Sequence, residues 1–204
     1  MLKFIHAADF HLDSPFGALT AQQAAARRRE SRELAFRLAN YVNQQGIDLV
    51  LLAGDLFDSG NAFRETGEQL AQAFGQTRAR VFIAPGNHDW YGPGSPWLTV
   101  DWPENVHIFQ TASMTAVELP EKNAVIHGAA FTGGEQGESL LAGFAAPKDG
   151  KLHIGLLHGE TDPAEQRYDP IRREEIAASG LAYLALGHIH KRTEPARLGS
   201  TLYA

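Results

Sequence analysis

Short apolar runs alternate along the first half of the chain with longer segments in which apolar residues recur at helical spacing. The runs Leu2–Ala7, Ile47–Ala53 and Arg80–Ala84 predict strands. A continuous apolar stretch such as IDLVLLA is typical of a strand buried on both faces. The intervening segments Thr20–Gln45 and Ala62–Gln76 predict helices. This alternation indicates an α/β protein.

A second group of strands follows. Apolar runs separated by turn residues predict strands at Val106–Phe109, Met114–Leu119, Ala124–Ala130, Lys151–Leu157 and Leu181–Leu186. Pro170–Ser179 predicts a helix, because proline is tolerated in a first helical turn. The last residues, Thr201–Ala204, look like the start of one more strand.

The composition narrows the possible sites. With 204 residues, 44% apolar and 21% charged, the chain fits one globular domain. The absence of cysteine excludes disulfides and thiolate metal sites. Any metal must therefore be held by His, Asp, Glu or Asn, and nine histidines are available.

The net charge of −6 argues mildly against a free-standing nucleic-acid binder, which usually has a basic surface. Two divalent cations would offset about four carboxylate charges locally, so the argument is weak. The N-terminus MLKFIHAADF lacks the apolar core of a signal peptide, and no apolar run could span a bilayer. We therefore expect a cytoplasmic protein without membrane contact.

Five polar clusters follow the apolar strands. They are Asp9-Phe10-His11, Gly54-Asp55-Leu56-Phe57-Asp58, Gly86-Asn87-His88-Asp89, His158-Gly159 and Gly187-His188-Ile189-His190. Ligands of open α/β sheets bind beyond the carboxyl ends of the strands. The five clusters are therefore expected to meet in one crevice.

The residue types in these clusters suit a pair of divalent ions. Carboxylate oxygen with imidazole nitrogen favours Mn, Fe, Zn or Co, whereas Ca and Mg prefer oxygen alone. Asp9 and His11 are two residues apart, as are His188 and His190, so in an extended segment each pair faces one way. A carboxylate such as Asp55 can bridge two metals about 3.5–4 Å apart.

The motif series Asp-x-His, Gly-Asp-x-x-Asp, Gly-Asn-His-Asp, a lone His and Gly-His-x-His resembles that of the calcineurin-like metallophosphoesterases. All five motifs are present in order. The contexts HAADFHLDSPF, GDLFD, GNHD and GHIH are most similar to bacterial SbcD-type DNA repair exonucleases of the YhaO-like branch. The resemblance implies a four-layer α-β-β-α sandwich of two mixed sheets.

The resemblance also implies roles for individual residues. Asp9, His11 and His190 would hold a first metal together with Asp55, and Asn87, His158 and His188 a second, with Asp55 shared. His88 would contact the scissile phosphate and protonate the leaving oxygen, and Asp89 would orient His88. Manganese is the expected metal, and hydrolysis would proceed by a hydroxide that bridges the two ions.

Some features depart from the family or limit the comparison. Asp58 stands where archaeal and eukaryotic nuclease relatives have histidine, and bacterial SbcD-like sequences also have Asp there. The nucleases continue after Gly-His-x-His into a capping domain and a segment that binds an SMC-like ATPase of SbcC type. We therefore expect residues 1–204 to be the catalytic domain without that region. Relatives often form dimers, so a homodimer is possible.

Several residues have a competing structural interpretation. His6, His107, His127 and His153 are expected to be structural, with His107 on the surface. Asp13 could be a loop residue or part of the active-site rim. Trp90, Tyr91 and Trp97 could pack a loop onto the core or form a platform on which an unpaired base stacks.

The sequence is compatible with three functions. A DNA exo/endonuclease is favoured by the HLDSPF and GDLFD contexts, and a phosphodiesterase or phosphatase acting on a small molecule such as a nucleotide is the alternative. A catalytically silent scaffold is disfavoured because every ligand position is filled. A Ser/Thr protein phosphatase is disfavoured by Ser59 and Asp89, where that branch has Arg and Glu.

Overall fold

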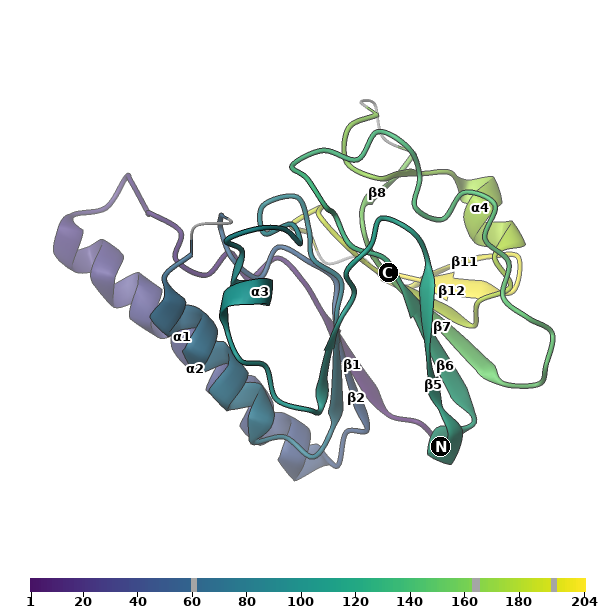
Figure 1. The fold of residues 1–204 in the computed structure, drawn as a ribbon, viewed down its shortest axis with the longest axis horizontal. Coiled ribbons are helices and arrows are strands. Elements are labelled where there is room, and N and C mark those ends of the chain that lie inside the picture. The colour runs from purple at the N-terminus through teal and green to yellow at the C-terminus, as the bar shows by residue number, and fades with distance from the viewer. Residues whose placement is uncertain (60–61, 163–165, 192–193) are drawn as a thin grey trace.

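Two sheets stack face to face in the structure, a computed structural model that describes residues 1–59, 62–162, 166–191 and 194–204 (Figure 1). The first sheet contains four parallel strands in the order β1 (Phe4–Ala7), β2 (Leu49–Leu52), β3 (Arg80–Ile83) and β4 (Val106–Ile108). The second is mixed, in the order β11 (Ala196–Leu198), β12 (Thr201–Tyr203), β10 (Tyr183–Gly187), β7 (Leu152–His158), β6 (Ala124–Gly128) and β5 (Thr115–Leu119).

Helices complete the outer layers. α1 (Ala21–Gln45) and α2 (Arg64–Gly75) cover the first sheet, and the short α4 (Arg173–Ala178) lies beside β11 on the second (Figure 1). The expected α/β sandwich is thus confirmed. No helix among the described residues is long and apolar enough to cross a bilayer.

Alternation within the first sheet explains its continuous apolar runs. Leu49 and Leu51 of β2 pack between the sheets, whereas Val50 and Leu52 face the helices. All four are buried. Such a run predicts burial on both faces. Packing on both faces holds the strand in place, and a polar cluster follows its end.

Local signals set the limits of α1. The Thr20 side chain accepts from the Gln23 N–H and the Gln23 side chain accepts from the Thr20 N–H, which forms a capping box. Gly46 ends the helix in the left-handed conformation at φ 59°. Leu34 and Tyr41, which contribute to the helical spacing, are exposed, and the small residues Ala35 and Ala39 are buried instead.

The predicted helix Pro170–Ser179 is too long at its start. Pro170–Ile171 form β9, which pairs with β8 (Glu160–Thr161), and the helix begins at Arg173. A two-residue pairing has no periodicity to detect in a sequence. No element was predicted for α3 (Pro96–Thr99), the 3-10 turn Pro120–Lys122 or β11.

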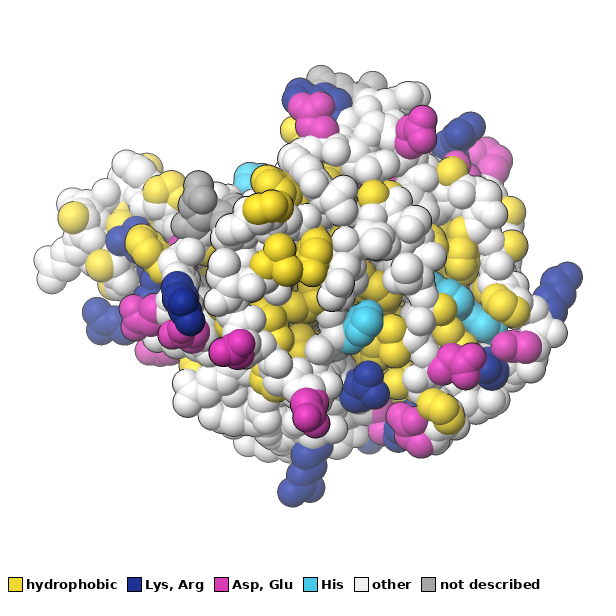
Figure 2. Space-filling model, in the orientation of Figure 1, with side chains coloured by type: hydrophobic (Ala, Val, Ile, Leu, Met, Phe, Trp, Pro, Cys, Tyr) yellow, Lys and Arg dark blue, Asp and Glu magenta, His cyan; other side chains and the backbone are white. Residues whose placement is uncertain are grey.

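Charged side chains of both signs are scattered over the face in Figure 2, around apolar patches near its centre. Among the residues that the structure describes, this face carries no broad basic patch, in line with the net charge of −6.

Candidate metal centre

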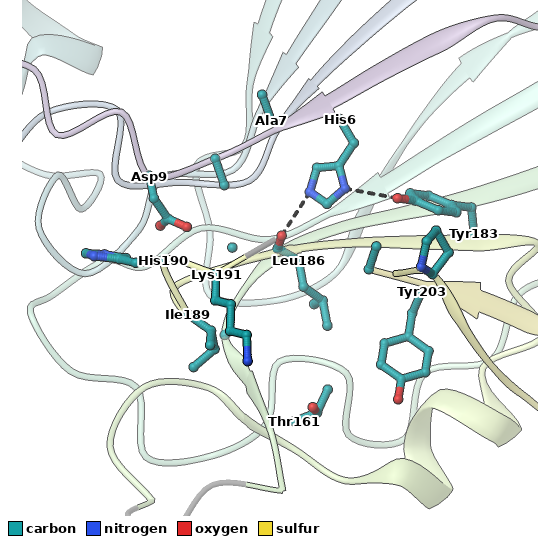
Figure 3. Close-up of a pocket in the computed structure, with 15 residues that line it drawn as sticks. His6, Ala7, Asp9, Thr161, Tyr183, Leu186, Ile189, His190, Lys191 and Tyr203 are labelled. Carbon is teal, nitrogen blue, oxygen red and sulfur yellow. Dashed lines mark hydrogen bonds between the residues drawn. The ribbon is translucent and has the colours of Figure 1, made fainter. Parts of the chain in front are cut away.

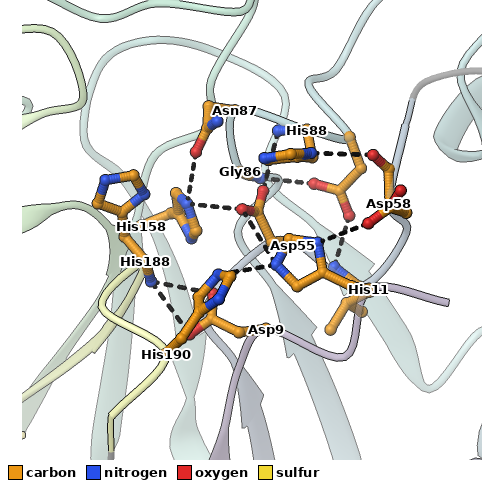
Figure 4. A network of polar contacts seen from close by, with 12 residues as sticks. Asp9, His11, Asp55, Asp58, Gly86, Asn87, His88, His158, His188 and His190 are labelled. Atoms are coloured by element: carbon orange, nitrogen blue, oxygen red, sulfur yellow. Dashed lines mark hydrogen bonds and ion pairs between the residues drawn. The ribbon is translucent and has the colours of Figure 1, made fainter. Parts of the chain in front are cut away.

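The carboxyl ends of five strands bring the predicted ligands together (Figure 4). Asp9 follows β1, Asp55 follows β2, and Asn87 follows β3 in the first sheet. His158 ends β7, and His188 and His190 follow β10 in the second. All seven predicted ligands gather at this edge, and their arrangement allows two groups.

The first group joins Asp9, His11, Asp55 and His190, whose ligand atoms all lie within 4.8 Å of one another. The Nε2 atoms of His11 and His190 are 2.9 Å apart. Both oxygens of Asp9 also lie near the backbone N–H of His188, at 3.0 and 3.2 Å. This N–H donor fixes the Asp9 carboxylate between the two sheets.

The second group joins Asp55, His158 and His188. Asn87 belongs beside it, because its Oδ1 lies 3.0 Å from Nε2 of His158. The ring of His158 is buried, and its Nδ1–H donates to the Ala53 carbonyl at 2.8 Å. That bond leaves Nε2 of His158 as the nitrogen that faces the cluster.

Asp55 lies between the groups. Its Oδ2 is 3.8 Å from Nε2 of His11 and 3.3 Å from Nε2 of His158, while its Oδ1 accepts from the His88 N–H at 2.9 Å. Burial raises the pKa of Asp55, but the His158 and His88 contacts outweigh it and hold the pKa below its usual value. An ionised carboxylate thus faces one histidine of each group, as a bridging ligand must.

The pairs Asp9/His11 and His188/His190 do not lie in the extended segments that their two-residue spacing suggests. Asp9, His11, Asp55, His188 and His190 all have positive φ, at 57°, 43°, 51°, 96° and 22°. Non-glycine residues rarely adopt this conformation, and it concentrates at functional sites where the surroundings impose it. The backbone therefore turns at these five ligands, which brings their side chains toward the common edge.

Two glycines permit the sheets to approach each other at this edge. A Cβ on Gly54 would lie 2.4 Å from Nδ1 of His158, and one on Gly187 would lie 2.0 Å from the Ala53 carbonyl oxygen. Any side chain at either position would therefore push the two groups apart.

The residues fit a pair of divalent ions. Their donor set combines carboxylate, amide and imidazole without sulfur, which suits Mn²⁺, Fe²⁺, Zn²⁺ or Co²⁺. Nδ1 of His11 faces Oδ1 of Asp58 at 3.2 Å, so its Nε2 points into the first group. Such outer contacts orient a histidine ligand.

Comparison with known proteins supports the same chemistry. A sequence profile of the calcineurin-like phosphoesterases matches residues 2–192. The chain belongs to this family. It is 36% identical over 202 residues to a Bacillus subtilis (strain 168) protein named uncharacterized metallophosphoesterase YhaO. The alignment covers 94% of this chain and 49% of that protein, so the chain spans about half the length of this relative.

Membership in the calcineurin-like phosphoesterase family supports metal-dependent hydrolysis of phosphoesters as the chemistry of the site.

His88 has an open position in the metal centre. His88 is exposed, and its Nδ1–H donates to the Asp58 carbonyl at 2.9 Å. Its ring packs edge-on against His11, with 4.9 Å between centroids. Nε2 is therefore the atom left to contact a substrate.

The predicted role of Asp89 in orienting His88 stays a prediction, and the hydrogen bonds of its side chain are to backbone groups. Its buried carboxylate accepts from the N–H groups of Gly86, Leu56 and Phe57, at 2.7, 2.8 and 3.2 Å. Burial raises its pKa to about 6. Asp89 thus braces the loops after β2 and β3 through their backbone, and Asp58 holds the His88 ring.

Asp58 contacts His88 through its carbonyl and His11 through its carboxylate, so the role of the carboxylate can be tested separately. An Asp58→Ala variant keeps the carbonyl that holds His88 but loses the group that faces His11. We expect the first ion to bind about 10–100-fold more weakly, with the second unchanged. Stepwise Mn²⁺ titration measures both affinities, and an unchanged first step would contradict this role.

His6 has the structural role expected for it. Its Nε2–H donates to the Leu186 carbonyl at 2.8 Å, and its Nδ1 lies 3.0 Å from the Tyr183 hydroxyl (Figure 3). These bonds join β1 to β10. His107 packs edge-on against Phe109 and is half-buried, so it is less exposed than expected.

His127 and His153 form a separate buried pair outside the metal centre. Nε2 of His127 lies 2.8 Å from Nδ1 of His153, whose Nε2 lies 2.9 Å from Oδ1 of Asp149. Burial, and after it the neighbouring His153, lower the pKa of His127 to about 4. The contact between the two rings links β6 to β7.

This pair predicts acid sensitivity. Unfolded His127 takes up a proton near pH 6.5 and folded His127 only near 4, so the unfolded state binds more protons in that window. The stability that His127 contributes should therefore fall as the pH falls from 6.5 to 4. Melting temperatures of the wild type and His127→Gln across this range test it. The decline should be shallower in the variant, and parallel curves would contradict the assignment.

The aromatic residues after the GNHD motif were expected either to pack a loop onto the core or to form a platform for an unpaired base. Trp97 is only 4% exposed, packs edge-on against Phe57 and donates from Nε1 to the Asp89 carbonyl, so it anchors the loop. Trp90 and Tyr91 are half-buried.

Sequence reasoning missed Tyr168, whose ring lies 5.0 Å from that of His188. It lies in no motif that would have pointed to it.

Proposed function

We propose that the chain is the nuclease domain of an SbcCD-like DNA repair system and hydrolyses DNA phosphodiesters with two divalent ions, Mn²⁺ in the first instance. The observation that carries the two-ion chemistry is the position of Asp55 Oδ2 between His11 and His158, at 3.8 and 3.3 Å. The HLDSPF and GDLFD sequence contexts support DNA as the substrate.

The residues of the site would have different roles in the proposed hydrolysis. Asp9, His11 and His190 would hold one ion, Asn87, His158 and His188 the other, and Asp55 both. When bound, such a pair lowers the pKa of a water between the ions and neutralises charge on the phosphoryl oxygens. His88, with Nδ1–H held by the Asp58 carbonyl, would stabilise the developing charge and give its Nε2 proton to the leaving oxygen.

A small nucleotide ester is the second candidate substrate, and one cavity favours it. The cavity measures about 710 Å³ and is lined by Asp9 and His190 of the metal centre together with Lys191 and Tyr203 (Figure 3). Pockets of about 300–1,000 Å³ suit small molecules. A nucleoside attached to a phosphate at the first group would fit there.

Hydrolysis measured side by side separates the candidates. The full-length protein with Mn²⁺ is offered labelled single- and double-stranded DNA, a cyclic nucleotide and a chromogenic bis-phosphodiester, with EDTA as the control. We expect DNA cleavage that EDTA abolishes. Cleavage of the small esters alone would refute the nuclease proposal and leave the phosphoesterase chemistry in place. Copurification of a long coiled-coil ATPase tests the proposed partner.

A further inference from the structure

The carboxylate of Asp13, two residues after His11, accepts four hydrogen bonds. Its side chain is only 5% exposed. Oδ1 accepts from Nε and Nη2 of Arg32, at 3.1 and 2.7 Å, and from the Thr66 hydroxyl at 2.9 Å. Oδ2 accepts from the Phe63 N–H at 3.1 Å. Asp13 is therefore a buried, fully used acceptor and not part of the open rim.

These donors come from two different parts of the chain, α1 and the start of α2. Arg32 lies on α1, Phe63 is the N-cap residue of α2, and Thr66 lies in the first turn of α2. Asp13 itself belongs to the loop that carries Asp9 and His11, and it has a positive φ of 68°. The strained backbone there aims the carboxylate at the helices.

The loop that ends at Asp13 runs beside the loop after β2. The His11 N–H donates to the Asp55 carbonyl at 3.0 Å, the Leu12 N–H to the Leu56 carbonyl at 2.8 Å, and the Asp58 N–H to the Leu12 carbonyl at 2.9 Å. His11, Asp55 and Asp58 are thus carried by one short parallel ladder. Asp13 fastens the far end of this ladder to α1 and α2.

We propose that Asp13 is a positioning residue for the first ion, acting through His11 and Asp58. It touches neither ion nor substrate in this arrangement. If its anchor is lost, the His11–Asp58 contact of 3.2 Å should loosen, together with the Asp58 carbonyl that holds His88. Asp55 is also held from the other side by the His88 N–H, and Asn87, His158 and His188 belong to other strands or the loops after them, so the second ion should be unaffected. The proposal rests on the two-ion function proposed above.

Asparagine is a selective substitution at Asp13, because it changes the hydrogen bonds of the side chain and not its size. It keeps the size of the side chain, but both oxygens of Asp13 face donors, so either orientation of an amide sets its NH₂ against another donor. Asp48→Asn is the matched control. Asp48 also accepts a backbone N–H, from Lys3 at 2.8 Å, and pairs with Lys122, away from the site.

The experiment measures ion affinities of the full-length protein by stepwise Mn²⁺ titration, with kcat, KM and melting temperature on the same samples. A His190→Ala reference identifies the titration step that belongs to the first ion. Asp13→Asn should weaken that step by about tenfold or more and lower kcat at limiting Mn²⁺. The second step and KM should match the wild type, and Asp48→Asn should leave both steps unchanged.

Two results would overturn the proposal. Equal weakening of both steps would make Asp13 a general stabilising residue, and an unchanged first step would remove its role altogether. If Asp13→Asn does not fold, Thr66→Val removes one of the four bonds and should give a smaller loss with the same selectivity. A wild type that binds fewer than two ions would refute the proposed function itself, a separate outcome.

Discussion

An Asp55→Asn variant is expected to bind at most one divalent ion per chain and to hydrolyse phosphodiesters at least roughly 10²–10³-fold more slowly than the wild type. The amide keeps the volume of this buried side chain, and its oxygen can still accept from the His88 N–H. It cannot replace Oδ2, which lies between His11 and His158. An NH₂ group there would face both rings and supply no negative charge.

Metal content after dialysis and the initial rate at saturating Mn²⁺ measure this effect. Asp48→Asn serves as the control for the same chemical change on the surface, and it should retain both ions and full activity. Two ions per chain with near wild-type turnover in Asp55→Asn would show that no ion pair depends on this carboxylate.

A His88→Ala variant should instead keep both ions and lose turnover, by about 10²–10⁴-fold for a DNA substrate. Nδ1 of His88 is already engaged by the Asp58 carbonyl, and neither of the two proposed ligand groups needs its ring. The leaving oxygen of DNA is a poor leaving group without a proton. Its departure should therefore depend strongly on Nε2.

The choice of leaving group makes this test specific. A nitrophenolate leaves without protonation, so a chromogenic diester should lose much less rate than DNA when His88 is removed. Equal losses on both substrates would assign His88 to charge stabilisation alone. Loss of an ion from His88→Ala would instead make it a ligand and contradict the assignment.

The order of the motifs and the strand–helix alternation were enough to predict where the site lies. Asp9, Asp55, Asn87, His158 and His188 each come at or directly after the end of a strand that its apolar run predicts. Because parallel strands carry their loops at one edge, the convergence of these residues follows from the topology. The capping box at Thr20 and the left-handed Gly46 likewise make the start and end of α1 local properties.

The contacts that tune the site depend on long-range packing and were not predictable. Asp89 is adjacent to His88 in the sequence, yet its carboxylate turns toward the N–H groups of Leu56 and Phe57. Asp13 could not be assigned because its partners Arg32 and Thr66 are distant in the sequence. The left-handed backbone at the ligands is imposed by the assembled sheets and has no local signal.

The most direct test of the two-ion centre is the Mn²⁺ stoichiometry of the full-length protein, combined with its electron paramagnetic resonance spectrum. Ions bridged by Asp55 would lie about 3.5–4 Å apart. The account predicts two Mn²⁺ per chain with a spin-coupled spectrum, which Asp55→Asn converts into that of an isolated ion. A single ion per chain, or two ions that give an uncoupled spectrum, would contradict it.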